Sequence, residues 1–371
     1  LYEPIFDYYQ VAFVDGGMKE MARSEKLLKY WDISISPEGK LARDVTSKFI
    51  NGYVPIYNQE DLNDVRILEG NKSDRKKEEL IDSINKGDPK TFGHLASKAK
   101  NKKINTEGFC GIEALGILKA DVDKLGILMS CGLQKEQFTI SRLATLSRQL
   151  NFYFAVYLPW LLKTEKEYND IYTVFAGGDD LFLIGPWNRI IDLISLLHET
   201  FSNYVCHNDE IHFSAGITIH KPNTPLSKLA ESAEEALEKS KGKGRNRITL
   251  FSETAEWKEF KSLMEIRDNL QEWREKKFIN NAMVYRMNDF IGLAETEKKL
   301  LESKEEIYLE DMECLKWHAL FCYTTTRNVG KELRGEEKEK KINEFVKAAG
   351  WLKGYGSKFK IALWDIMYNN R

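Results

Sequence analysis

The chain has 371 residues, of which 42% are hydrophobic, so it has room for two or three domains with cores of their own. With 55 Lys or Arg against 57 Asp or Glu, its net charge of −2 excludes a general basic field for nucleic acid and leaves only local contacts to RNA. No long apolar run and no signal-like start occur, which argues against membrane insertion or secretion and predicts a cytoplasmic protein.

Residues 1–105 do not follow one periodic pattern. A helix is predicted near Met18–Tyr30 and a strand at Trp31–Ser36, followed by a stretch punctuated by proline, which is typical of the end of a preceding domain. From Glu69 to Asn105 the sequence is polar and rich in lysine, and we interpret it as a connector that contains a helix. Its basic residues allow a local RNA contact, but runs of charge are usually solvated, so we expect a solvated linker.

A strand that ends in acidic residues follows the connector. Leu115–Ala120 is largely apolar and leads into a short helical run through Asp121-Val122-Asp123-Lys124-Leu125. We predict that Asp121 binds metal and that the backbone carbonyl of Val122 adds a further hard oxygen ligand. Where the strand turns into the helix, phosphate could be held by the backbone amides of Asp123, Lys124 and Leu125.

Two apolar runs joined by a glycine pair predict a hairpin. Ile171–Phe175 and Leu181–Ile184 are rich in β-branched and aromatic residues, and the tip between them reads Gly177-Gly178-Asp179-Asp180. The glycines allow the positive φ that a tight turn requires. Two adjacent carboxylates repel each other unless a divalent cation lies between them, and oxygen ligands favour Mg²⁺ or Mn²⁺. An ordinary solvated Gly-Asp turn is the alternative.

An acidic strand end beside an acidic hairpin tip is the arrangement by which palm-type nucleotidyl transferases hold two metal ions against a triphosphate. One ion lowers the pKa of the attacking hydroxyl, and the other offsets charge on the departing pyrophosphate. We therefore expect Asp121 to join Asp179 and Asp180 in one catalytic site.

A further strand is expected at Ile211–Ile219, and a helix with cations at its end follows. Apolar residues repeat at helical spacing from Leu226, and the segment ends in Ser-Lys-Gly-Lys-Gly-Arg-Asn at 240–246. Lys241 and Arg245 lie four residues apart, a spacing that could set both on one side of the helix end, and both are suited to holding phosphates. A basic helix end stopped by its glycines is the alternative.

After Phe251 the pattern changes to charged amphipathic helices, which predicts an all-α bundle. The expected helices are Trp257–Lys277, Asn280–Ser303, Leu309–Arg327, Glu337–Lys353 and Lys358–Tyr368. Five tryptophans in these helices are expected in the core or at an interface. We thus divide the chain into residues 1–105, the end of a preceding domain with its connector, residues 106–252, a palm, and residues 253–371, the bundle.

Four motifs resemble the nucleotidyl cyclase palm in the order of that family. They are Leu-Lys-Ala-Asp-Val-Asp-Lys-Leu-Gly at 118–126, Ala-Gly-Gly-Asp-Asp at 176–180, Phe-Ser-Ala-Gly-Ile at 213–217 and Ser-Lys-Gly-Lys-Gly-Arg-Asn at 240–246. The hairpin sequence Gly-Gly-Asp-Asp-Leu resembles the large subunit of type III CRISPR effector complexes, most closely the Csm, or III-A, branch. Supporting segments are Lys48–Pro55, Arg142–Arg148 and Tyr323–Asn328.

This resemblance implies an α+β fold, with a ferredoxin-like palm followed by the helical bundle. It also implies a subunit that converts ATP into cyclic oligoadenylate when its complex holds a target RNA beside the guide RNA. In the family, the residues matching Asp121, Asp179 and Asp180 hold metal, and those matching Lys241 and Arg245 face the triphosphate. The bundle abuts the small helical subunits of the complex, a contact for which Tyr323–Asn328 are candidates. Ser141 and Ser147 are candidates for the adenine pocket.

Two departures from the family matter. Its members usually begin with a His-Asp nuclease domain and a first palm, whereas no His-Asp dipeptide occurs here, so the chain resembles a fragment. Two ATP molecules meet between two palms in the family, which leaves open that this chain binds nucleotide without completing a cycle. We do not carry the nuclease activity over to this chain.

Two other functions stay open. A diguanylate cyclase is disfavoured by Asp180, where that family prefers Glu, and by the C-terminal bundle. A scaffold whose palm binds nucleotide without turnover is disfavoured by the clustered carboxylates of Asp121, Asp179 and Asp180, for which a pure scaffold has no physical need.

Overall fold

The computed structural model describes residues 2–5, 9–12, 53–69, 73–82, 84–103, 107–302, 308–309, 311–331 and 333–371. The two earliest strands, β1 (Tyr2–Ile5) and β2 (Tyr9–Ala12), pair as an antiparallel hairpin. The helix expected near Met18–Tyr30 and the strand expected at Trp31–Ser36 lie outside the described residues. No helix in the described part of the chain is both long enough and apolar enough to cross a membrane.

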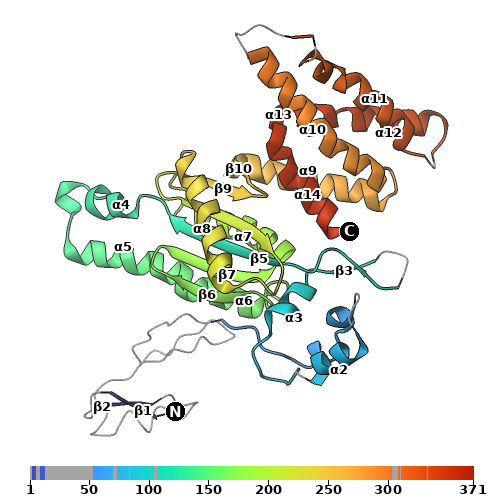
Figure 1. Ribbon diagram of the computed structural model, residues 1–371. Coiled ribbons are helices and arrows are strands. Elements are labelled where there is room, and N and C mark those ends of the chain that lie inside the picture. Colours follow the sequence, from blue (N-terminus) through green and yellow to red (C-terminus); the bar gives the residue numbers. More distant parts are fainter. Residues whose placement is uncertain are drawn as a thin grey trace.

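A six-stranded sheet forms the centre of the molecule (Figure 1). Its strands are β5 (Leu115–Val122), β6 (Tyr172–Gly177), β7 (Asp180–Pro186), β8 (Phe213–His220), β9 (Arg247–Leu250) and β10 (Glu253–Glu256). They lie in the order β10-β9-β8-β5-β7-β6, and every pair is antiparallel except β8 with β9. The predicted acidic strand is therefore central, between the predicted hairpin and β8.

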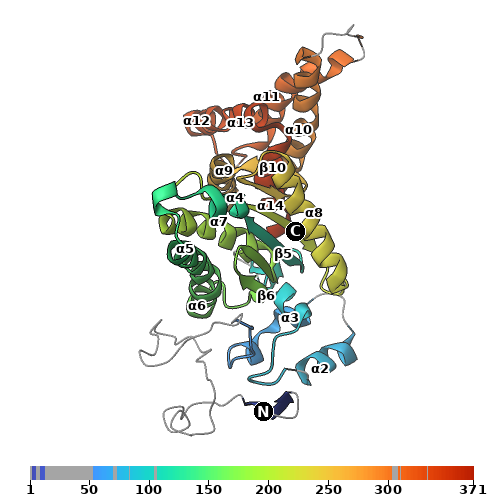
Figure 2. The same ribbon diagram turned by 90° about the vertical axis from the view of Figure 1, so that its left-hand side faces the viewer.

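Helices cover both faces of this sheet (Figure 2), and they are listed here with their bounds. One face carries α8 (Leu226–Gly242), and the other carries α5 (Ile140–Phe152), its π-helical extension (Tyr153–Tyr157), α6 (Leu158–Thr164) and α7 (Trp187–Tyr204). The short α4 (Leu125–Cys131) follows β5, with a 3-10 turn at Lys135–Gln137 before α5. The predicted α+β palm fold is confirmed.

Alternation along β5 explains how the strand divides its side chains between these layers. Leu118, Ala120 and Val122 belong to the large core that includes α7, whereas Leu115 and Ile117 pack with the buried apolar residues of α8. Asp121 has the same parity as Leu115 and Ile117, so its side chain is on the face of α8. Because side chains alternate along the strand, the Asp121 carboxylate lies on the face covered by α8, the helix that contains Lys241.

The close contact of α8 with β8 fixes the end of that helix. A Cβ atom on Gly216 would lie 2.3 Å from the backbone nitrogen of Leu237, so only glycine allows this approach. Near the end of α8, Ser240 Oγ donates to the carbonyl of Ala215 at 2.7 Å. Lys241, the next residue, is held in place by this buried contact.

The helical bundle follows β10. Its helices are α9 (Trp257–Glu275), α10 (Asn281–Glu302), α11 (Trp317–Asn328), α12 (Gly335–Val346), α13 (Ala348–Tyr355) and α14 (Lys360–Asn369), with 3-10 turns at Asp311–Lys316 and Gly356–Phe359. The helix expected over Leu309–Arg327 begins as 3-10, and the one expected over Glu337–Lys353 is divided at Lys347. Trp257 and Trp317 are buried, as expected of bundle core residues.

The sheet and the bundle share one continuous core that runs from Ala99 to Ile366. β10 lies beyond residue 252 yet pairs with β9, and the amide of Ile112 donates to the carbonyl of Tyr368 at 3.0 Å. The division of the chain into three parts stays a prediction, and the hydrogen-bonded sheet continues across its second boundary.

The lysine-rich connector is more ordered than its composition indicates. It contains α2 (Asp74–Asp82), α3 (Phe92–Ser97) and β3 (Asn101–Lys102), is preceded by 3-10 turns at Asp61–Asn63 and Val65–Leu68, and is followed by β4 (Phe109–Cys110), which pairs with β3. Leu95 and Ala96 of α3 are fully buried against β5 and β7. The expectation of a solvated linker was wrong for this part, because an apolar stretch inside the charged segment packs on the sheet.

Candidate active site

The Gly-Gly-Asp-Asp turn is a two-residue hairpin loop between β6 and β7. Gly177 pairs with Asp180, and Gly178 has φ +67° at the first loop position, where a type II′ turn places glycine. The amide of Gly178 donates to Oδ1 of Asn151, which reaches the turn from α5, at 2.9 Å. Asp179 is half-buried and Asp180 is exposed at the tip.

The end of β5 meets this tip directly. Asp121 is opposite Asp180 in the register of β5 and β7, and the amide of Val122 donates to the carbonyl of Asp179 at 3.1 Å. On its other side Asp121 is opposite Ser214 of β8. The strand register thus brings the backbone of the three predicted aspartates to one end of the sheet, although they are about sixty residues apart in the chain. Their carboxylate oxygens are not all within 4.8 Å of one another.

Several charged groups surround Asp121 at this end of the sheet and shift its pKa. Burial raises its pKa to about 6, Lys241 acts in the opposite direction, and the negative charges of Asp180 and Asp179 raise the pKa further. Lys241 Nζ lies 2.8 Å from Asp121 Oδ2 and 3.2 Å from Glu238 Oε1. Burial alone would lower the pKa of Lys241, but these two carboxylates raise it. The lysine is therefore a permanent cation beside the aspartates.

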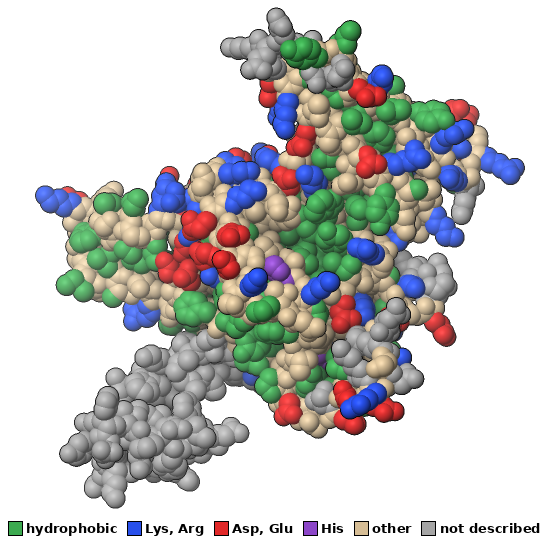
Figure 3. Space-filling view, viewed as in Figure 1, with side chains coloured by type: hydrophobic (Ala, Val, Ile, Leu, Met, Phe, Trp, Pro, Cys, Tyr) green, Lys and Arg blue, Asp and Glu red, His purple; other side chains and the backbone are tan. Residues whose placement is uncertain are grey.

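A cleft of about 460 Å³ opens beside these groups. Its lining includes Asp121, Asp180 and Lys241 together with Phe175 and Phe182 of the hairpin. Acidic side chains gather on the face of the molecule where α8 lies (Figure 3), and α8 itself exposes Glu231, Glu235 and Glu238. The side of the site that α8 covers is thus negative, which favours cations there.

Asp123 has a different environment from the one expected. Its carboxylate is completely buried and accepts hydrogen bonds from Ser214 Oγ, from the amide of Asn246 at 2.9 Å and, when Nδ1 carries the proton, from His212 at 2.8 Å. Arg245 Nε is 4.0 Å away. The amide of Asp123 donates to the carbonyl of His212, so this residue is fully engaged within the protein. Its contacts join the end of β5 to β8 and to the segment that follows α8.

The remaining predicted phosphate ligands lie on two sides of the buried Asp123 carboxylate. Lys124 has φ +55° and begins α4, whose first residue, Leu125, packs against the core. Arg245 follows the end of α8 rather than extending it, because the helix ends at Gly242 and Arg245 has φ +62°. Arg245 lines a separate cleft of about 430 Å³, so Lys241 and Arg245 are not on one helical face as the spacing suggested.

Sequence reasoning missed the side chains that support the site. Ser141 and Ser147 are exposed on α5 and do not line the cleft of Asp121, whereas Asn151 on the same helix contacts the hairpin turn. His212, which was not among the predicted site residues, contacts Asp123. The polar Ser214 inside an otherwise apolar strand was the one visible signal for a buried hydrogen-bond partner.

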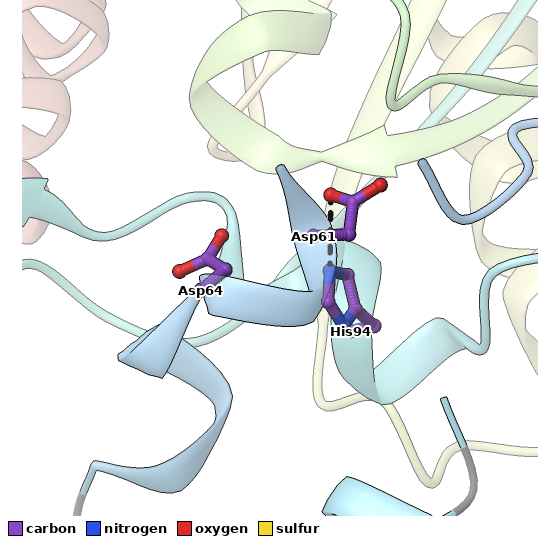
Figure 4. Close-up of side chains that lie close together, drawn as sticks. All are labelled: Asp61, Asp64 and His94. Carbon is purple, nitrogen blue, oxygen red and sulfur yellow. Dashed lines mark ion pairs between the residues drawn. The ribbon is translucent and has the colours of Figure 1, made fainter. Parts of the chain in front are cut away.

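A second cluster of metal-ligating side chains lies ahead of the palm, on the segment just before the connector and on α3 (Figure 4). One donor atom from each of Asp61, Asp64 and His94 lies within 4.8 Å of the others, and no other such trio occurs among the described residues. Lys98 Nζ is 2.6 Å from both aspartates, and Lys90 Nζ is 2.7 Å from Asp61. Two buried ammonium groups therefore already supply the positive charge that a metal would bring, and they keep the pKa of Asp61 well below its usual range despite its burial.

Comparison with known proteins agrees with the geometry. Residues 114–249 match the second palm domain of Cas10/Cmr2. The palm of this chain is similar to that domain. Curated relatives include the subtype III-A Cas10/Csm1 single-strand-specific deoxyribonucleases of Methanocaldococcus jannaschii, 33% identical over 59% of this chain and 27% of the relative, and Enterococcus italicus, 31% identical over 63% of this chain and 30% of the relative. The chain spans less than a third of the length of these relatives.

Solved structures share the fold. A Csm1-Csm4 cassette without ligand superposes with a TM-score of 0.54 at 20% identity, covering 89% of this chain and 42% of the other. Csm1 of T. onnurineus gives a TM-score of 0.51 at 21% identity, covering 90% of this chain and 44% of the other. The similarity of fold extends across the palm and into the helical bundle, since it covers most of the chain.

Proposed function

We propose that the Cas10 palm of this chain is a metal-dependent nucleotidyl transferase that joins ATP into cyclic oligoadenylate as part of a type III-A CRISPR effector. The observation that carries this proposal is the register of β5 with β7, which sets Asp121 opposite Asp180 beside the ammonium group of Lys241. A carboxylate cluster next to a fixed cation suits a bound, metal-complexed triphosphate.

The donor set fits a hard divalent cation. Asp121, Asp179 and Asp180 supply carboxylate oxygens at one edge of the sheet, and mutual repulsion of their charges raises the pKa of Asp121 beyond the effect of burial. We propose these three residues, with the carbonyl of Val122, as the ligands of Mg²⁺ or Mn²⁺. When bound, the metal would polarise the α-phosphate and the attacking 3′-hydroxyl.

The residues of this chain would orient the nucleotide. Lys241 lies beside the acidic groups, and once a metal compensates Asp121 its ammonium group is free to contact phosphate oxygens. Arg245, with a half-exposed side chain, would approach the triphosphate from the neighbouring cleft. Gly177 and Gly178 carry no side chains, which would allow a phosphate to approach the backbone beside Asp179, and the amides of Lys124 and Leu125, which follow the end of β5, would offer further donors.

Complexes of structurally similar proteins support this substrate. Csm1-Csm4 cassettes have been solved in complex with one ATP, at a TM-score of 0.53, and with the cyclic products cA3 and cA4, each at 0.52. Their sequence identity of 20% establishes the fold alone, so the transfer of ATP chemistry to this chain is part of the proposal.

The bundle offers a surface for other subunits. On α11, Leu320 and Tyr323 are exposed, and the Arg327 guanidinium lies 5.0 Å from the Tyr323 ring centroid. Large exposed apolar side chains on one helix face are typical of an interface. We propose this face for the small helical subunit, with guide RNA and target RNA reached through the assembled complex.

Calorimetric titration of this chain with ATP and with GTP, each in Mn²⁺ and in EDTA, tests the proposal. We expect binding that requires the metal and favours ATP. A preference for GTP would restore the diguanylate cyclase hypothesis. Binding of neither nucleotide would contradict nucleotide use by this palm alone and favour a scaffold, or a site completed by a second palm.

A further inference from the structure

A larger cleft, of about 950 Å³, lies between the palm and the bundle. We call it the junction cleft. Its lining comes from β3, the beginning of α7, α9, the end of α11 and α14, which meet beside the C-terminus in Figure 1. It is at the beginning of β5, whereas Asp121 is near the end of that strand, about 20 Å away at the usual rise per residue. The junction cleft is therefore separate from the candidate active site.

The charges that line the junction cleft are unbalanced. Seven Lys or Arg and four Asp or Glu side chains contribute to it. Arg267 is matched, since its Nη1 lies 2.8 Å from Asp192 and 3.6 Å from Asp365. The other six cations form no ion pair with any residue that the structure describes: Lys102, Lys103, Arg189, Arg274, Lys277 and Lys331. A chain with a net charge of −2 thus concentrates unpaired positive charge in one cleft.

Neutral groups hold one of these cations, Arg274, without cancelling its charge. Arg274 donates to Oδ1 of Asn281 at 3.0 Å and to Oδ1 of Asn370, and Asn370 in turn donates to Gln271. Amide partners orient a guanidinium group but leave its full charge available to an anion. Burial of Asp365 raises its pKa to about 7, so at neutral pH this carboxyl contributes less than one negative charge.

The chemistry of the lining selects one kind of ligand. Besides the cations, amide side chains form its floor, where Asn369 Oδ1 accepts from Asn101 and from Asn188 at 3.0 Å. No aromatic ring lines the cleft among the described residues, so stacking on bases does not contribute to binding there. Spaced cations and amides without aromatic rings suit phosphate and sugar groups.

We propose that the junction cleft binds the phosphodiester backbone of a single-stranded nucleic acid, independently of base sequence and of the ATP site. Lys102 and Lys331, two exposed lysines of the lining, would each contact a phosphate. Affinity then follows the release of counterions and falls steeply with salt, as for other phosphate-dominated interfaces.

The test uses the full chain and single-stranded RNA and DNA of one mixed sequence, labelled with fluorescein and followed by anisotropy between about 50 and 300 mM salt. The variant Lys102→Gln with Lys331→Gln removes two unpaired cations from the cleft. The matched control, Lys340→Gln with Lys347→Gln, makes the same charge change at exposed lysines of the bundle outside the cleft. Lys340 and Lys347 form no ion pair among the described residues.

We expect the cleft variant to bind both strands at least about tenfold more weakly, with the log-log salt slope reduced by about 1.4, or about 0.7 for each lost contact. The control should stay within about twofold of the original protein. Equal losses in both variants, or no binding of either strand at about 50 mM salt, would overturn the proposal. A variant with Asp179→Ala and Asp180→Ala should retain strand binding, so failure of the ATP site and failure of the cleft remain distinguishable.

Discussion

Replacement of Asp123 by Asn tests whether this buried carboxylate positions the phosphate-binding segment. Asparagine keeps the size of the side chain but removes its negative charge and one acceptor oxygen. His212 and the amide of Asn246 both bond to Oδ2. The NH₂ group would therefore take the Oδ1 side, towards Ser214 and Arg245, and both remaining bonds would go to a neutral acceptor. Hydrogen bonds to a charged acceptor contribute about 1.5–3 kcal/mol each, so we expect a loss of about 3 kcal/mol in the free energy of unfolding. The segment after α8 would then lose its anchor on β5.

The effect on nucleotide binding follows from Arg245, the neighbour of Asn246. If its guanidinium contacts the triphosphate, displacing it removes about 2 kcal/mol, or about 30-fold in affinity for ATP. The assay is calorimetric titration with Mn²⁺-ATP, combined with chemical denaturation. Asp61→Asn is the control, because Asp61 is also buried and hydrogen-bonded but lies ahead of the connector and outside the palm. In this variant, stability should fall while ATP affinity stays within about twofold.

A double-mutant cycle separates positioning from general destabilisation. If Asp123 acts through Arg245, adding Asp123→Asn to Arg245→Ala should cost less than about threefold in further ATP affinity. The reasoning would be refuted if Asp123→Asn reduced affinity equally in both backgrounds, or if Asp61→Asn reduced it as much.

Three further predictions concern the acidic groups. Asp179→Ala combined with Asp180→Ala should abolish metal-dependent ATP binding and leave the circular dichroism spectrum unchanged; undiminished affinity for Mg²⁺-ATP would contradict the site assignment. Burial raises the pKa of Asp121 to about 6 in the folded protein, above its ordinary value near 4, so the folded state holds the proton more tightly and stability falls as pH rises from about 4 to 6. Asp121→Asn should remove this dependence and raise the melting temperature at pH 8, and an unchanged pH profile would refute the burial argument. The pKa of Asp61 is depressed, so its contribution to stability is present above about pH 4 and is lost as the pH falls further; Asp61→Asn should flatten acid unfolding monitored by fluorescence.

Local patterns predicted the elements of the palm well. The hairpin expected from Ile171–Phe175 and Leu181–Ile184 is present as β6 and β7, and the strand expected at Ile211–Ile219 is β8, shifted by two residues or fewer. These predictions rest on period and turn chemistry, which are properties of adjacent residues. The convergence of Asp121 with the hairpin came from comparing two acidic termini with a known catalytic arrangement rather than from periodicity.

Interactions between distant segments were not predictable in this way. Asp123 resembled a phosphate-binding position because its partners His212 and Asn246 are about 90 and 123 residues away in sequence. Lys90 and Lys98 resembled solvated charges because Asp61 and Asp170, which allow their burial, lie outside the charged run. A single sequence shows the charge of a residue but not the partner whose opposite charge stabilises it when it is buried.

The hydrogen bond from Ile112 to Tyr368 joins the approach to β5 with α14 across 256 residues of chain. During synthesis at about 5–20 residues per second, the segment before the central strand would wait roughly 10–50 s for this partner. The edge hairpin and α7 can assemble earlier, because their contacts are closer in sequence. The start of β5, and the polar junction beside it, would therefore be completed last on the ribosome, and this end of the palm is where a nascent chain is longest exposed to chaperones and proteases.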